Sequence, residues 1–224
     1  MAAGVTAALM ALPLAAGCEA APPPASAEWQ QPFDRLEHNW EVTRGLGHLG
    51  IRLTVLTGNQ TFACDGEGLT ANYAGIAVYC RNERTVVVAE SRFQSVARAA
   101  VQRGGTVEAA RAILLGHEIG HRVDERIRGK LVASKETELR ADCLAGEGLE
   151  DSGETVRPAD AEAFYAAASL KPDQDQKAAN PHGIAAERLK YFELGSSKGI
   201  KGDSDGCGVR GHALHQDGSI EPGI

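Results

Sequence analysis

The segment from Val107 to Arg126 constrains the fold most, because its spacing of apolar residues predicts one long, largely buried helix. A glycine pair ends the preceding helical pattern, and Thr106 is a good N-cap for the new helix. Inside this segment the run LLGHEIGHRVDE places His117 and His121 four residues apart. Residues at this spacing lie on one face of a helix, so both imidazoles can point toward one metal ion.

The HEIGH motif predicts one zinc ion per chain. Zinc accepts imidazole nitrogens, which His117 and His121 would provide. Glu118 follows the first histidine directly, where its carboxylate can act as a general base toward a water molecule at the metal. The alternative is a buried helix that carries two histidines by coincidence. The apolar neighbours and the good cap favour the metal site.

A catalytic zinc site needs a third protein ligand. The metzincin class would place glycine and histidine where this chain has Asp124 and Ile127, so that class is excluded. A glutamate from a second helix is the other solution, and Glu138 lies seventeen residues after His121. This separation leaves enough chain to lay a second helix against the first.

Asp142 favours Glu138 as the third ligand over the nearby Glu136. Asp142 follows Glu138 at i+4 on the same face, where it can accept a hydrogen bond from the second ring nitrogen of a ligating histidine. The corresponding neighbour of Glu136 is Arg140, which offers no such support. The alternative for this helix is a solvated charged face.

Four cysteines, Cys64, Cys80, Cys143 and Cys207, remain when Cys18 is set aside. An even number predicts two disulfides, for which the sequence alone allows three connectivities. We favour Cys64 with Cys80, because a loop of about fifteen residues is easily closed, which leaves Cys143 with Cys207. A zinc site built from cysteines would want a CxxC pair, and the sequence contains none.

The first eighteen residues are almost wholly apolar and end in small residues before Cys18, which resembles an export signal with a lipoprotein cleavage box. We therefore expect an exported protein of the cell envelope, anchored through a lipid on Cys18. The alternatives are a cleaved signal without lipid, or an uncleaved apolar helix. Residues 19–28 are rich in proline and alanine and predict a stiff tether. One domain is expected over 29–210, followed by a flexible tail over 211–224.

The charge balance argues against a nucleic-acid partner. The chain has 23 Lys and Arg against 30 Asp and Glu, for a net charge of −7, and no clustered basic face. We expect a peptide or protein substrate instead.

The secondary structure predicted from periodicity is mostly helical, with a few strands. Strands are expected at 51–55, and as a hairpin of 74–80 with 85–90. Helices are expected at 30–46, 91–102, 107–126, 134–146, 158–170 and 181–195, with the fourth ending near Gly146 and the sixth at Gly195. The fold class is therefore α+β.

HEIGH and ELRADCLAG together resemble the motifs of a bacterial family of neutral zinc metallopeptidases, a glutamate-zincin group with HExxH followed by a stretch close to ELQADCFAG. The stretches VYCRNERTVVV, NPHGIAAERLKYFELG and GC at 206–207 are also similar to that family, so the resemblance covers about residues 60–207. It implies a zincin-like α+β fold, with a small antiparallel sheet edging the active-site cleft.

The resemblance also implies roles for residues outside the two motifs. A peptide substrate would lie along the strand that contains Val86, Val87 and Val88 and pair with its backbone. His182 becomes a candidate partner for the oxyanion of the transition state. From the residues alone, His182 is only a histidine near the start of a helix, where a capping or surface role is the alternative.

The expected function is therefore that of an exported zinc-dependent endopeptidase, with Glu118 as general base. The alternative is a non-catalytic zinc-containing envelope lipoprotein that acts as a binding or assembly module. That alternative needs a site closed by a fourth protein ligand, for which His182, His212 and His215 are the candidates.

Overall fold

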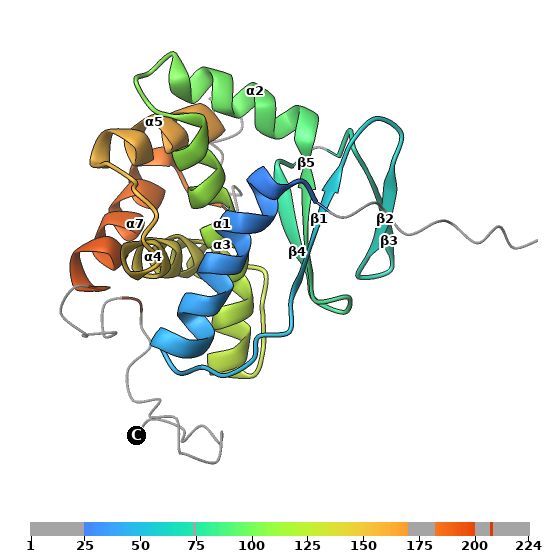
Figure 1. Cartoon of the computed structure of the whole chain (residues 1–224), viewed down its shortest axis with the longest axis horizontal. Helices are drawn as coiled ribbons and strands as arrows, with labels where there is room; N and C mark the ends of the chain where they lie inside the picture. Colours follow the sequence, from blue (N-terminus) through green and yellow to red (C-terminus); the bar gives the residue numbers. More distant parts are fainter. Residues whose placement is uncertain (1–24, 74, 170–181, 200–206, 208–224) are drawn as a thin grey trace, which may run out of the picture.

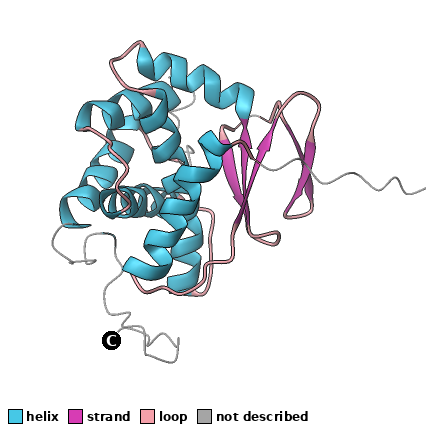
Figure 2. Cartoon of the chain, in the orientation of Figure 1, coloured by secondary structure: helices cyan, strands magenta, loops and turns pink. Residues whose placement is uncertain are grey.

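The computed structural model describes residues 25–73, 75–169, 182–199 and 207. Its helices gather on one side and its strands on the other, in an α+β arrangement (Figures 1 and 2). The helices are α1 (Ala27–His38, continued by the π-helical turn η1, Asn39–Thr43), α2 (Glu90–Val101), α3 (Val107–Arg128), α4 (Lys135–Asp151), α5 (Pro158–Ala168) and α7 (Ala185–Gly199). The strands are β1 (Arg52–Leu56), β2 (Thr61–Cys64), β3 (Glu67–Thr70), β4 (Ala77–Cys80) and β5 (Thr85–Ala89).

Helix α3 occupies the centre of the helical side and confirms the predicted HEIGH helix. The Thr106 side chain caps it by accepting a hydrogen bond from the backbone N–H of Ala109, at 3.2 Å. Gly129 ends it in the left-handed conformation, with φ of 69°. Every residue from Ala109 to His121 is buried, because α1, α2, α4, α5 and the sheet all pack against this helix.

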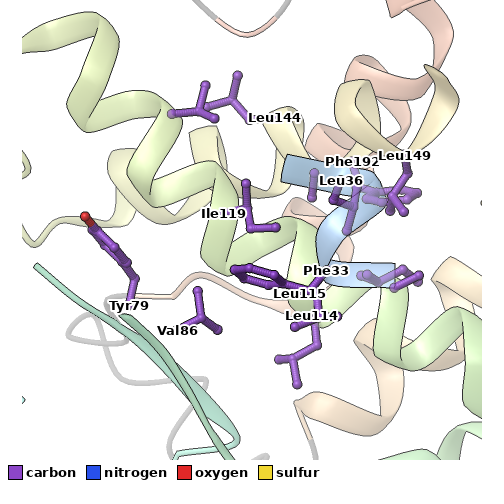
Figure 3. Packing of buried hydrophobic residues seen from close by; sticks show 14 of the residues in the cluster. Phe33, Leu36, Tyr79, Val86, Leu114, Leu115, Ile119, Leu144, Leu149 and Phe192 are labelled. Carbon is purple, nitrogen blue, oxygen red and sulfur yellow. The ribbon is translucent and has the colours of Figure 1, made fainter. Parts of the chain in front are cut away.

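One hydrophobic core holds α3 in place. Helices α1, α3, α4 and α7 and strands β4 and β5 all contribute to it (Figure 3). The side chains labelled there are Phe33, Leu36, Tyr79, Val86, Leu114, Leu115, Ile119, Leu144, Leu149 and Phe192. This apolar packing fixes the rotation of α3 about its own axis. It therefore also fixes the direction in which the polar residues of α3 point.

The main sheet has the order β1-β5-β4, with β5 parallel to β1 and antiparallel to β4. The predicted hairpin is therefore confirmed, whereas the prediction of a purely antiparallel sheet is wrong. Val86 and Val88 pack into the helical core, and Val87 packs with Leu56 and Cys80 on the opposite face. Because both faces of β5 are buried, its sequence is continuously apolar rather than alternating.

The position of β5 contradicts the predicted substrate strand. Both backbone edges of Thr85–Ala89 are already paired, one with β1 and the other with β4. The side chains of Val86, Val87 and Val88 are at most 2% exposed. An added peptide strand has no free hydrogen-bonding edge on β5, so this prediction is wrong. Strand β4 is the outer strand on that side of the sheet.

The β2–β3 hairpin was not predicted, although its turn carries a recognisable signal. Asp65 and Gly66 both have positive φ, at 50° and 88°, which is the conformation that Asp-Gly favours in two-residue hairpins. The Asp65 carboxylate accepts hydrogen bonds from the backbone N–H groups of Arg81 and Asn82 in the β4–β5 turn. The four-residue strands beside it are too short to show a clear alternation.

The predicted stops at Gly146 and Gly195 are both wrong, because α4 and α7 continue past them. These glycines serve helix packing. A Cβ atom on Gly146 would overlap the carbonyl oxygen of Phe192, and one on Gly195 would overlap that of Cys143. Helices α4 and α7 therefore touch backbone to backbone.

Replacing Gly195 by alanine should lower the free energy of unfolding by about 1–3 kcal/mol, because the added methyl group forces the two helices apart. Chemical denaturation measures this. Gly68→Ala is the matched control, since a Cβ there meets no atom within 4 Å. Equal stability of the Gly195 variant and the wild-type chain would contradict the backbone contact.

Both predicted disulfides are present. Cys64 in β2 bonds to Cys80 in β4, and Cys143 in α4 bonds to Cys207. Disulfides are consistent with a location outside the cytoplasm. None of the helices in the described ranges combines the length and the apolar composition that a membrane span requires. Cys18, the 1–18 signal, most of the 19–28 tether and the 211–224 tail lie outside the described residues.

The two disulfides should contribute unequally to stability. The sequence separations are 16 and 64 residues, which correspond to about 3 and about 4 kcal/mol from the restricted unfolded chain. Alanine replacement of both cysteines in each pair, followed by chemical denaturation, tests this. A loss below about 1 kcal/mol for the Cys143–Cys207 pair would contradict it.

Candidate metal centre

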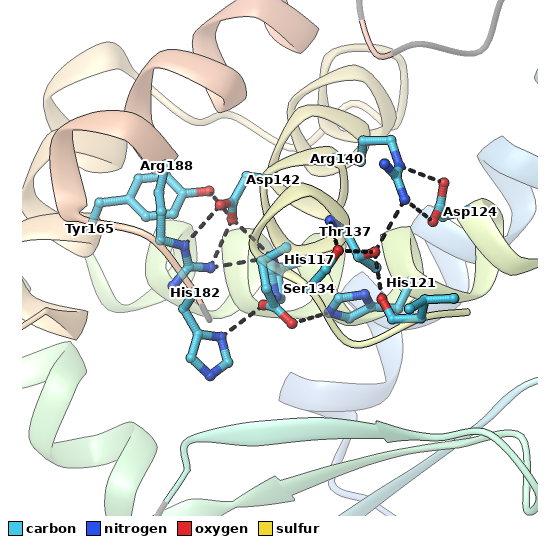
Figure 4. A network of polar contacts seen from close by, with 12 residues as sticks. His117, His121, Asp124, Ser134, Thr137, Arg140, Asp142, Tyr165, His182 and Arg188 are labelled. Carbon is cyan, nitrogen blue, oxygen red and sulfur yellow. Dashed lines mark hydrogen bonds and ion pairs between the residues drawn. The ribbon is translucent and has the colours of Figure 1, made fainter. Parts of the chain in front are cut away.

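Helices α3 and α4 bring the three predicted ligands together. Figure 4 shows His117 and His121 with their polar neighbours. The Nε2 atom of His117 lies 3.2 Å from Glu138 Oε2, and that of His121 lies 3.6 Å from Glu138 Oε1. One potential ligand atom from each residue lies within 4.8 Å of the other two. Both histidines are buried, and the Glu138 side chain is 14% exposed.

Small residues and one ion pair allow α4 to approach the histidines. Gly120, inside the HEIGH motif, faces the backbone of Ala141, and a Cβ atom there would lie 2.8 Å from the Ala141 carbonyl oxygen. The guanidinium of Arg140 donates to both carboxylate oxygens of Asp124 on α3, at 2.9 and 3.1 Å. These contacts set the crossing of the helices, and Ser134 caps the α4 end next to Glu138.

Glu136, the competing ligand, points away from the site. Its side chain is 79% exposed and accepts a hydrogen bond from Arg140 at 2.7 Å. The choice of Glu138 over Glu136 from the position of Asp142 therefore agrees with the geometry.

The predicted contact between Asp142 and a ligand histidine is present. His117 Nδ1 lies 2.8 Å from Asp142 Oδ1, and Asp142 is completely buried. An ionised carboxylate only accepts hydrogen bonds, so Nδ1 carries the proton and Nε2 presents a lone pair. That lone pair faces the carboxylate of Glu138, and two acceptors at this distance require a cation or a proton between them.

The pKa shifts of His117 and Glu138 show how these side chains balance their charges without a metal ion. Burial lowers the pKa of His117, but the Asp142 charge and hydrogen bonds to Asp142 and Glu138 outweigh it and raise the pKa. Burial opposes ionisation of Glu138, yet its hydrogen bonds to His117 and His182 lower its pKa. A proton on His117 then occupies the place that a metal ion would take. Two imidazoles and one carboxylate also match the donors that zinc accepts, so the residues fit the metal.

His121 and Glu118 respond mainly to burial. Burial, followed by the charge of His117, lowers the pKa of His121 to about 3, so this imidazole is neutral. A neutral imidazole is the form that binds metals. Burial raises the pKa of Glu118 to about 7, with a further contribution from Glu138. A carboxylate that titrates near neutral pH is suited to proton transfer.

His182 contacts a ligand instead of joining the ligand group. Its Nδ1 atom lies 2.8 Å from Glu138 Oε2, and its side chain is 58% exposed. Among the described residues, the group of potential ligand atoms at this site contains His117, His121 and Glu138. The other two candidates for a fourth ligand, His212 and His215, lie outside the described residues.

Sequence reasoning missed three residues near the site. Arg188 on α7 and Tyr165 on α5 both bond to Asp142. Arg188 lies in the NPHGIAAERLKYFELG stretch, which is the one signal that could have suggested it. Tyr73 lies in the loop between β3 and β4, and its pKa is raised by burial and then by the charges of Glu118 and Glu138. No spacing in the sequence links Tyr73 to these glutamates.

No protein-family model, no curated protein and no solved structure matches this chain. The family resemblance of the HEIGH and ELRADC motifs, and the zincin-like fold that it implies, therefore stay predictions.

Glu138→Gln should weaken zinc binding by more than about 100-fold. Replacing a residue that only hydrogen-bonds to a metal ligand costs up to about that factor, and Glu138 is a proposed ligand itself. The amide replaces a charged ligand by a neutral one. Glu136→Gln, on the same turn of helix, is the matched control and should bind zinc like the wild-type chain. Titration against a chromophoric chelator measures both. Equal affinities of the two variants would contradict the ligand assignment.

Proposed function

We propose that the chain is a zinc-dependent peptidase that hydrolyses peptide bonds outside the cytoplasm. One observation carries this proposal: His117, His121 and Glu138 converge from two helices, with the Glu118 carboxylate one residue after the first histidine. Three protein donors are the number found in catalytic zinc sites, whereas structural sites use four.

Glu118 is the proposed general base. A zinc ion held by the three ligands would supply a Lewis acid for the peptide carbonyl and for the attacking water. Glu118 accepts the proton of that water and passes it to the leaving amine, so no proton is gained or lost over the reaction. Its burial and its raised pKa support both steps, because the same group must take up and release a proton near neutral pH.

The outer strand β4 replaces β5 as the proposed place for the substrate. Strand β4 packs against α3 and has a partner strand only on its β5 side within the described sheet. An extended peptide can add to such an edge through backbone hydrogen bonds. Recognition would then depend more on the peptide backbone than on particular side chains.

The non-catalytic alternative is less well supported. It needs a fourth protein ligand, and the described candidate, His182, instead directs its Nδ1 toward Glu138. The exported location is supported by the two disulfides. A lipid anchor on Cys18 remains part of the proposal and concerns a residue outside the described ranges.

Glu118→Gln should reduce the cleavage of unfolded casein by a factor of about 10²–10⁴, because the amide cannot accept a proton. Zinc content should stay at one ion per chain, and a chelator should abolish the wild-type activity. Glu108→Gln serves as the control, since Glu108 is an exposed residue on the same helix. Full activity in the Glu118 variant would rule out this mechanism. A zinc-loaded wild-type chain without activity toward peptides would favour the binding module.

A further inference from the structure

We infer that Arg188 and Tyr165 are positioning residues of the metal centre, which hold Asp142 so that Asp142 holds His117 in the orientation for zinc. This inference rests on the proposed zinc site. Neither residue offers a ligand to the metal, and both come from helices that supply none.

Four hydrogen bonds hold the Asp142 carboxylate. Oδ2 accepts from Arg188 Nε at 2.8 Å, and Oδ1 accepts from Arg188 Nη2 at 2.8 Å, Tyr165 Oη at 3.0 Å and His117 Nδ1 at 2.8 Å. A carboxylate has about four acceptor positions, and this one accepts as many hydrogen bonds. Asp142 is 0% exposed, so water cannot substitute for a lost partner at its surface. The carboxylate is therefore held by residues from three other helices, α3, α5 and α7.

Arg188 pairs with Asp142 in a defined orientation. The guanidinium binds the carboxylate through two parallel hydrogen bonds, which fix direction as well as distance. It also lies over the ring of Tyr165, at 5.2 Å from the ring centre. The Tyr165 ring packs in turn against Phe192 of α7, at 5.8 Å between ring centres. Arg188 and Tyr165 therefore support each other as well as Asp142.

The two histidines differ in how their Nδ1 atoms are held. His117 donates its Nδ1 proton to Asp142, whereas His121 Nδ1 is buried and has no hydrogen-bond partner among the described residues. A hydrogen bond from the ring nitrogen that does not bind the metal normally fixes the tautomer and the ring plane of a ligand histidine. In the described site Asp142 makes the shorter contact with His117 Nδ1, at 2.8 Å, and Arg188 Nη2 lies 3.3 Å from the same nitrogen (Figure 4). The fixation of Asp142 by Arg188 and Tyr165 therefore determines where His117 Nε2 points.

The experiment compares matched variants of the purified full-length chain. The test variants are Tyr165→Phe, Arg188→Lys and Arg188→Met. Tyr79→Phe is the control for the first, because Tyr79 Oη also donates to a carboxylate, that of Glu125, at 3.0 Å. Arg157→Met is the control for the arginine, because Arg157 forms a comparable two-bond pair with Asp160. The carboxylates in both controls do not bond to a ligand histidine in the described structure.

Two readouts separate positioning from general stability. The first is the zinc dissociation constant, measured by competition with a chelator. The second is the visible absorption spectrum of the Co²⁺-substituted chain, which responds to ligand geometry. We expect Tyr165→Phe and Arg188→Met to bind zinc about 10–100-fold more weakly than wild type and to shift the Co²⁺ bands. Arg188→Lys keeps the charge but loses the paired hydrogen bonds, so it should fall between wild type and Arg188→Met. Both controls should bind zinc within about twofold of wild type.

Wild-type zinc affinity and an unshifted Co²⁺ spectrum in Tyr165→Phe and Arg188→Lys would overturn the inference. It would also be overturned if the two controls lost as much zinc affinity as the test variants. If Arg188→Met does not fold, Tyr165→Phe and Arg188→Lys decide the question. A wild-type chain that binds zinc but cleaves no peptide would refute the proposed function and leave this inference standing, whereas a wild-type chain that binds no zinc would refute both.

Discussion

Helices α3 and α4 can cross closely only because Gly116 and Gly120 leave room for the residues that face them on α4. Alanine at either position would press against Ala145 or Ala141. The apolar core fixes the rotation of α3, and the Arg140–Asp124 pair fixes the position of α4 along it. Without this crossing, a carboxylate from the second helix would not reach the two imidazoles of the first.

Buried charge is the cost of that arrangement, and the structure distributes it over neighbouring helices. Asp142 and Arg188 neutralise each other in the interior, where a single charge would be strongly unfavourable. Glu138 lies between His117 and His182, and its pKa is lowered by both although burial opposes this. Pairs such as these cost more than apolar packing of the same volume. Their presence beside two histidines supports the proposal of a functional site at this position.

The candidate site was largely predictable from the sequence, because spacing on a helix determines which side chains share a face. His117 with His121, and Glu138 with Asp142, needed only the periodicity of two helices. Arg188 and Tyr165 were not predictable in this way, since their contacts depend on how α5 and α7 pack against α4. The same limit explains Gly146 and Gly195, where a glycine that resembles a helix stop serves a backbone contact. The order of the sheet was also hidden, because a continuously apolar strand indicates that both of its faces are buried but not which strands lie beside it.

The residues of the site are spread along the chain, and this affects when the site can form during synthesis. His117 and Arg188 belong to α3 and α7, and α4 and α5 come between them in the sequence. A newly made chain that has emerged only as far as the HEIGH segment holds two histidines without the carboxylates and the arginine that orient them. High affinity for metal at the proposed zinc site would then develop late, after the last helix has docked. Zinc loading of the proposed site would therefore follow folding rather than precede it.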